Sequence, residues 1–135
     1  MSLLASPAVD VETAELRPAN RRVAAAPSRA EAIWAADGAV AGTAVTWRDG
    51  GDVRVAAVGD VLRIGRSLNA DVRLEDVHTS RRHALIRRDG DTLTLCHEKS
   101  LNGLWLNGRP VTVQAPLRDD DVVLVGVTEL RVVDL

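Results

Sequence analysis

Three short polar clusters in the second half of the chain carry side chains suited to binding a phosphate group. Residues 65–66 read Gly-Arg, residues 80–83 read Ser-Arg-Arg-His, and residues 100–103 read Ser-Leu-Asn-Gly. A hydroxyl and a planar guanidinium both donate hydrogen bonds to phosphate oxygens. A carboxamide donates to one main-chain group and accepts from another, so it suits contact with an extended peptide. Each cluster alone also fits an ordinary solvated loop.

The serine and the histidine of residues 80–83 could also suggest nucleophilic catalysis, with Asp76 as a third member. No Gly-x-Ser-x-Gly turn surrounds Ser80, and a separation of three residues in a loop does not define the geometry of a nucleophile and its base. We therefore expect a protein that is not an enzyme. An enzyme would show turnover that depends on Ser80 and His83.

The chain offers no standard set of metal ligands. His78, His83, Cys96 and His97 do not follow a known metal-binding spacing, and a single cysteine excludes an internal disulfide. We expect His83 to support a loop through hydrogen bonds. We expect neither a metal nor a cofactor.

The charge balance argues against nucleic acid as a partner. The chain has 17 basic and 19 acidic residues and a formal net charge of -2, whereas nucleic-acid-binding domains are typically basic. Arg87 and Arg88 point to opposite faces of an expected strand. No aromatic side chains alternate with the basic residues to stack on bases.

Hydropathy and composition indicate the cellular location and the source of the protein. No stretch approaches the ~18 consecutive apolar residues of a membrane helix, and the start of the chain lacks the basic and apolar regions of a signal peptide. We therefore expect a cytoplasmic protein without membrane contact, and a monomer. Lys99 is the only lysine beside many arginines and alanines, a bias that favours a bacterial source.

From residue 44 onward, short runs of valine and leucine alternate with Asp-Gly and Asn-Gly turns. A spacing of about 8–12 residues with such turns is typical of an all-β sandwich or barrel, and no long helical period suggests a βαβ fold. We predict an all-β, two-sheet β-sandwich. The expected strands are 45–47, 53–55, 61–64, 72–74, 84–87, 93–95, 105–106, 111–113, 122–125 and 129–133.

Residues 1–43 are expected to form a flexible N-terminal tail, largely disordered over residues 1–27. They are rich in alanine, contain three prolines and show weak periodicity, so they bury too little apolar surface to order themselves. Ser28 and Glu31 have the spacing of a capping box, and a glycine stands at position 38. Residues 29–37 therefore fit either a short helix or a loose linker.

If that helix forms, we expect Ile33 or Trp34 to pack against the sandwich. If residues 29–37 form a loose linker instead, the start of the chain could reach across the domain.

The ordered set of clusters, followed by Trp-Leu-Asn-Gly at residues 105–108, resembles the forkhead-associated (FHA) domain family. The resemblance covers about residues 44–135, and the motif stretch within it covers residues 62–108. It implies an FHA/SMAD-like β-sandwich that binds phosphothreonine peptides through loops at one end.

The resemblance also implies a role for each matching residue. Arg66 would contact the phosphate, Ser80 would donate its hydroxyl to it, and Arg81 would be a second cation. Asn102 would hold the peptide main chain after the phosphothreonine. Leu101 stands where many members have threonine, so only its backbone N–H would contact the ligand.

Five further residues match positions that shape or support the loops of the family. The resemblance assigns this supporting role to Gly65, His83, Ser100, Gly103 and Asn107.

The function implied is that of a phosphothreonine-dependent protein–protein interaction module in bacterial Ser/Thr kinase signalling. Its partner would be a phosphothreonine-containing protein or peptide, such as a Ser/Thr protein kinase or a kinase substrate. The alternative is a phosphate-independent interaction scaffold that docks a folded partner through a sheet face.

The tail itself contains a candidate ligand for the predicted site. Thr13 lies in the acidic stretch 10–16, Asp-Val-Glu-Thr-Ala-Glu-Leu, with an apolar residue three places after it. If a kinase phosphorylates Thr13, the tail could bind the domain's own site and inhibit it. The alternative is an ordinary polar threonine.

Overall fold

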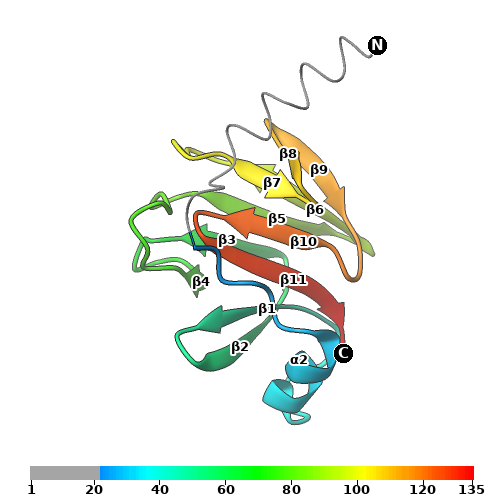
Figure 1. The fold of residues 1–135 in the computed structure, drawn as a ribbon. Helices are drawn as coiled ribbons and strands as arrows, with labels where there is room; N and C mark the ends of the chain where they lie inside the picture. Colours follow the sequence, from blue (N-terminus) through cyan, green and yellow to red (C-terminus); the bar gives the residue numbers. More distant parts are fainter. Residues whose placement is uncertain (1–21) are drawn as a thin grey trace, which may run out of the picture.

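Two β-sheets stack face to face and carry a short helix beside one edge (Figure 1). The computed structural model describes residues 22–135. The helix is α2 (Arg29–Ala36), and the strands are β1 (Thr43–Asp49), β2 (Asp52–Ala57), β3 (Val61–Gly65), β4 (Val72–Arg73), β5 (Ala84–Asp89), β6 (Thr92–His97), β7 (Leu104–Leu106), β8 (Arg109–Pro110), β9 (Gln114–Leu117), β10 (Val122–Val125) and β11 (Thr128–Asp134).

The strand order confirms the expected all-β, two-sheet sandwich. One sheet has the order β2-β1-β11-β10-β7-β8, and the other has the order β4-β3-β5-β6-β9. Neighbouring strands pair antiparallel, except β3 and β4, which are parallel. This parallel pair matters for the site because it brings two distant residues side by side.

One predicted strand is wrong. Residues 111–113 lie in a loop, and the strand is β9, which contains Pro116. β9 pairs with β6 and lies at the edge of its sheet. An edge strand tolerates proline because the missing N–H does not interrupt a second hydrogen-bonded ladder. The proline that seems to end a strand in the sequence therefore lies inside one.

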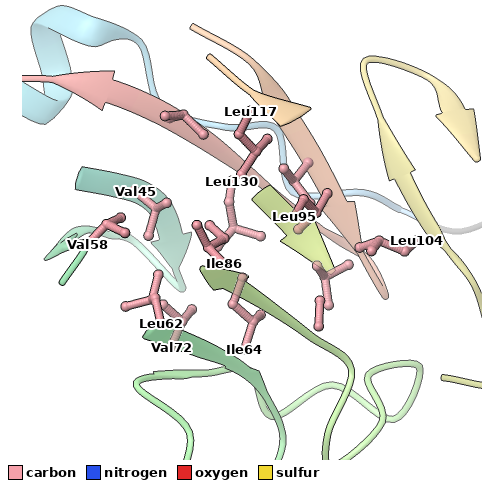
Figure 2. Close-up of a cluster of buried hydrophobic side chains, with 14 of the residues drawn as sticks. Val45, Val58, Leu62, Ile64, Val72, Ile86, Leu95, Leu104, Leu117 and Leu130 are labelled. Atoms are coloured by element: carbon pink, nitrogen blue, oxygen red, sulfur yellow. The ribbon is translucent and has the colours of Figure 1, made fainter. Parts of the chain in front are cut away.

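The core between the sheets is built from aliphatic side chains. Val45 and Leu130 come from one sheet, and Ile64, Ile86 and Leu95 come from the other. All five are almost fully buried and lie close to the middle of the sandwich (Figure 2). The chain has no phenylalanine or tyrosine, so branched aliphatic residues supply the apolar burial that holds the sheets together.

Residues 22–28 differ from the expected disorder at the start of the chain. Ala24 lies beside Thr128 in a parallel bridge. The Ala24 N–H donates to the Val127 carbonyl oxygen at 2.8 Å, and the Ala24 carbonyl oxygen accepts from the Glu129 N–H at 3.0 Å. Main-chain hydrogen bonds of this kind do not depend on hydrophobic side chains, so composition alone does not predict them.

Helix α2 begins at the capping box. The Ser28 hydroxyl oxygen accepts from the Glu31 N–H, and the Glu31 carboxylate accepts from the Ser28 N–H. The helix ends before Asp37, which has a left-handed backbone conformation with φ 48°. No helix within residues 22–135 is long and apolar enough to span a bilayer.

The helix packs through an alanine and not through the larger residues expected from the sequence. Ala32 is fully buried in a small cluster with Ala44 and Val133. Ile33 and Trp34 are 54% and 84% exposed. A small side chain at the contact allows the helix to approach the strands closely, which leaves the bulky neighbours on the solvent side.

Candidate functional site

Three loops at one end of the sandwich bring the predicted clusters together, on the left of Figure 1. The Arg66 N–H donates to the Ser80 carbonyl oxygen at 3.0 Å, and the Leu101 N–H donates to the Ser80 hydroxyl oxygen at 3.3 Å. Residues from all three clusters are therefore neighbours. The loops are residues 66–71 after β3, residues 74–83 before β5, and residues 98–103 after β6.

The Arg66 side chain is exposed, and one of its nitrogens is already held. Its Nε donates to the Thr79 carbonyl oxygen at 3.0 Å. Neither terminal nitrogen has a hydrogen-bond partner among residues 22–135. The guanidinium is thus anchored at one point and can offer its two other nitrogens to the oxygens of a ligand.

A surface pocket of about 630 Å³ lies beside Arg66, and Arg73 and Arg81 also line it. Glu75 lines the same pocket and pairs with Arg73 at 2.8 Å. Sequence spacing did not indicate Arg73. Only the parallel pairing of β3 and β4, which sets Gly65 beside Arg73, brings this cation to the site.

Ser80 connects two of the loops. Its N–H donates to Nδ1 of His83 at 3.0 Å, and its hydroxyl oxygen accepts from the Leu101 N–H. The hydroxyl hydrogen is then free to point at a ligand oxygen. The Leu101 side chain is 97% exposed, while its N–H, expected at the ligand, contacts Ser80 in this structure.

The loop after β6 is stabilised by its own polar side chains. The Ser100 hydroxyl oxygen accepts from the Gly103 N–H at 2.9 Å and lies 2.8 Å from Nε2 of His97. Nδ2 of Asn102 donates to the His78 carbonyl oxygen at 2.9 Å, which joins this loop to the loop before β5. The Asn102 carboxamide therefore lies at the junction of two site loops.

His83 is fully buried beneath the loops and uses both ring nitrogens. Because Nδ1 accepts from the Ser80 N–H, the proton is on Nε2, which donates to the Gly103 carbonyl oxygen at 2.6 Å. Burial lowers the pKa of His83, and the neighbouring His97 adds to this effect. The Gly103 carbonyl and Asp76 oppose the shift, so the ring stays neutral to lower pH than an exposed histidine.

The free energy of unfolding is expected to fall as the pH drops below about 6.5, the ordinary pKa of histidine. The folded protein holds His83 neutral, so the unfolded chain takes up the proton first. For one proton the slope approaches about 1.4 kcal/mol per pH unit until the lower pKa of the folded state is reached. Urea titrations at about pH 7.5 and about pH 5 measure the difference.

The control for this prediction is His83→Gln, which removes the ionisable ring. This variant should be less stable at neutral pH, and its free energy of unfolding should change less between the two pH values. An equal change in both proteins would show that His83 does not cause the pH dependence.

Two glycines in the site leave no room for a side chain. A Cβ on Gly65 would lie 2.8 Å from the carbonyl carbon of Arg81 and closer still to its oxygen. Gly103 has φ +82°, and a Cβ there would lie 2.8 Å from the ring of Trp105. Both glycines allow the loops to approach their neighbours closely.

Asn107 lies outside the cluster of loops, at the far end of β7 from Gly103. With φ 51° it forms the turn of the β7–β8 hairpin together with Gly108, whose φ is 83°. Its Oδ1 accepts from the Val122 N–H, and its Nδ2 donates to Asp121, both at 2.9 Å. Any support that Asn107 gives to the site therefore acts through the hairpin.

The arrangement does not match a Ser-His-Asp catalytic triad. His83 contacts the main chain of Ser80 and not its hydroxyl. Asp76 accepts from the Thr79 hydroxyl at 2.7 Å and from the His78 N–H at 2.9 Å, so it orders the loop that holds Arg66. Within residues 22–135, no group of three or more histidine, cysteine or acidic side chains could hold a metal ion.

Comparison with known proteins adds independent evidence. The family model of the FHA domain matches residues 62–126. FHA domain-containing protein FhaA of Mycobacterium tuberculosis is 39% identical over 94 residues, which are 68% of this chain and 18% of FhaA. Glycogen accumulation regulator GarA of Mycolicibacterium smegmatis is 40% identical over 62 residues, which are 46% of this chain and 39% of GarA. The match thus spans less than half of either relative.

Solved structures agree with the sequence matches. The FHA domain of FhaA, crystallised in complex with the intracellular domain of Rv3910, superposes with a TM-score of 0.61 and 35% identity. That match covers 67% of this chain and 98% of the solved chain. A domain from a study of phosphothreonine-dependent FHA domain interactions gives the same TM-score and identity, with 70% and 97% covered. The matching sequence and fold show that the chain belongs to the FHA domain family.

Proposed function

We propose that this protein binds other proteins at a phosphorylated threonine and acts as an interaction module in bacterial Ser/Thr kinase signalling. The observation that carries the proposal is that Arg66, Ser80 and Asn102 lie on three adjoining loops that hydrogen bonds join to one another. These residues supply a guanidinium, a hydroxyl and a carboxamide. A phosphothreonine carries about -1.5 to -2 charges and three acceptor oxygens at neutral pH. The pocket beside Arg66 supplies the complementary positive charge.

Each residue has a distinct part in the proposed complex. The terminal nitrogens of Arg66 and the exposed side chain of Arg81 bind the phosphate, and Ser80 donates its hydroxyl hydrogen to it. The Leu101 N–H either stays on Ser80 or turns toward the phosphate. Asn102 holds the main chain that follows the phosphothreonine, because its Oδ1 has no hydrogen-bond partner among residues 22–135 while Nδ2 binds a neighbouring loop.

An oriented library of phosphothreonine peptides, followed by calorimetric titration of the selected sequence, tests this function. Two or three charge-assisted hydrogen bonds of roughly 1.5–3 kcal/mol each, with main-chain contacts, give an affinity in the micromolar range, about -8 kcal/mol. The same peptide with unmodified threonine should bind far more weakly. Equal binding of both peptides would favour the phosphate-independent scaffold.

We further propose that phosphorylated Thr13 binds this same site in its own chain. Thr13 lies outside the described residues, but Arg22 is nine positions after it. Arg22 lines a pocket of about 430 Å³ together with Arg73 and Glu75, and these two residues also line the pocket beside Arg66. Nine extended residues span up to about 30 Å. The segment between Thr13 and Arg22 is therefore long enough to bring Thr13 to the site.

Phosphorylation of Thr13 is therefore expected to weaken binding of an external phosphopeptide by roughly 100-fold or more. An intramolecular ligand at an effective concentration in the millimolar range outcompetes an external peptide that binds with micromolar affinity. Titration of the kinase-treated chain measures the effect, and a kinase-treated Thr13→Ala chain is the control. Undiminished affinity in the chain phosphorylated at Thr13 would contradict self-capture.

A further inference from the structure

Two adjoining surface pockets near the site share a marked excess of positive charge. The pocket of about 630 Å³ beside Arg66 and a second pocket of about 250 Å³ have Ser67, Asn69 and Arg81 in common. Their linings together hold five arginines and two glutamates, in a chain whose formal net charge is -2. The arginines are Arg63, Arg66, Arg73, Arg81 and Arg82.

The two glutamates neutralise only part of this charge. Glu98 pairs with Arg82 at 3.2 Å in the smaller pocket, and Glu75 pairs with Arg73 in the larger one. Within residues 22–135, neither Arg63 nor Arg81 has a carboxylate oxygen within 4.0 Å of its guanidinium. The smaller pocket therefore keeps two unpaired guanidinium groups beside a single carboxylate.

A single phosphate does not use both pockets. A phosphothreonine bound by Arg66 lies at the larger pocket, and its charge leaves Arg63 in the smaller pocket without an anion. We propose that this smaller pocket, here called the second anion pocket, binds a second anionic group on the same partner peptide. This inference rests on the proposed phosphothreonine binding and extends it.

The position of Asn102 indicates on which side of the phosphothreonine the second group lies. Asn102 lines another pocket, of about 600 Å³, which shares no lining residue with the two arginine-rich pockets. If the residues after the phosphothreonine lie over Asn102, the residues before it run past Arg81 toward the second anion pocket. The second group therefore belongs on the N-terminal side of the phosphothreonine.

The chemistry of the second anion pocket suits a phosphate or a carboxylate. Arg63 presents a planar donor group that binds either anion through paired oxygens. Arg81 lines both pockets and adds positive charge to each. Ser67 and Asn69 add a hydroxyl and a carboxamide to the lining. A second phosphoserine or phosphothreonine should bind more strongly than a glutamate because it carries more negative charge.

Calorimetric titration with matched peptides tests the proposal. Each peptide carries one phosphothreonine and, at one of the preceding positions, serine, glutamate or phosphoserine. At the best position, phosphoserine is expected to raise the affinity about tenfold over serine, with a smaller gain for glutamate. The gain should shrink as salt is added, because the arginines are exposed.

Three variants identify the residues that cause the gain. Arg63→Gln should bind the serine peptide as the unchanged protein does and should lose most of the phosphoserine gain. Glu98→Gln removes the competing carboxylate and should increase that gain. Arg87→Gln removes an exposed arginine of β5 that lines neither pocket, so the gain should stay the same.

The results separate this proposal from the one it rests on. If the serine peptide binds but no second anionic group improves the affinity, the second anion pocket is refuted and phosphothreonine binding stands. A gain that persists unchanged in Arg63→Gln refutes it as well. If no phosphothreonine peptide binds at all, both proposals fail.

Discussion

Replacing Arg66 by alanine is expected to weaken phosphothreonine-peptide binding by about 100-fold or more and to leave the fold intact. The side chain is exposed, and its one hydrogen bond within residues 22–135 is to the Thr79 carbonyl oxygen, so its loss costs little stability. The phosphate loses two charge-assisted hydrogen bonds of roughly 1.5–3 kcal/mol each, and a 100-fold change needs only about 2.7 kcal/mol. Calorimetric titration gives the affinity, and urea denaturation gives the stability.

Two further variants make this prediction specific. Arg66→Lys keeps the charge but lacks the planar pair of donors, so its affinity should fall between those of the unchanged protein and Arg66→Ala. Arg54→Ala removes an exposed arginine from β2, in the opposite sheet, and should bind normally. If Arg66→Ala binds the phosphopeptide normally, either another residue binds the phosphate or the binding does not depend on the phosphate.

Replacing Gly65 by alanine should destabilise the protein by roughly 2–4 kcal/mol and also abolish peptide binding. The new Cβ would overlap the carbonyl group of Arg81. This group belongs to the main chain, so a change of side-chain rotamer cannot relieve the overlap. Relief of this overlap requires β3 and the loop that carries Ser80 to move apart. The Arg66 N–H would then lose its hydrogen bond to the Ser80 carbonyl oxygen, and the hydroxyl would leave the phosphate position.

Gly59→Ala is the matched control, because a Cβ at Gly59 meets nothing within 4 Å and its φ is not positive. This variant should change the free energy of unfolding by less than about 1 kcal/mol. The change should be stabilising where alanine lowers the conformational entropy of the unfolded chain. Urea denaturation of both variants measures the contrast. Equal stabilities of the two variants would show that the close approach at Gly65 is not required.

The sequence predicts the sandwich well because the signals of its strands are local. Runs of valine and leucine and the Asn-Gly turn at residues 107–108 depend on neighbours in the chain, and the structure has the hairpin there. Pro116 misleads because its meaning depends on whether the strand is central or at an edge. That property belongs to the sheet and not to any stretch of sequence.

For the site, the order of the clusters predicts which loops lie together. It does not predict every residue that lines the pockets beside these loops. Arg66, Ser80 and Asn102 are found on adjoining loops, as the resemblance implies. Arg73 reaches the site through the pairing of β3 with β4, and Arg63 reaches it as a lining residue of a surface pocket. No spacing rule relates them to the clusters, since their positions follow from tertiary structure.

Helix α2 and the segment before it show the same limit in the first third of the chain. The capping box is a local signal, and the helix starts where it predicts. Which face of the helix packs is decided by Ala44 and Val133, which are distant in the sequence. Hydrophobicity favours Ile33 or Trp34 for that contact, but the residue that is buried there is Ala32.

The buried imidazole of His83 has a consequence for the thermodynamics of association. Through one ring it joins the Ser80 main chain to the Gly103 main chain, so two of the three recognition loops are preorganised before any ligand arrives. Little configurational entropy is then lost when the complex forms. Affinity differences among ligands of equal charge should accordingly appear in dissociation rates, while association rates stay nearly constant.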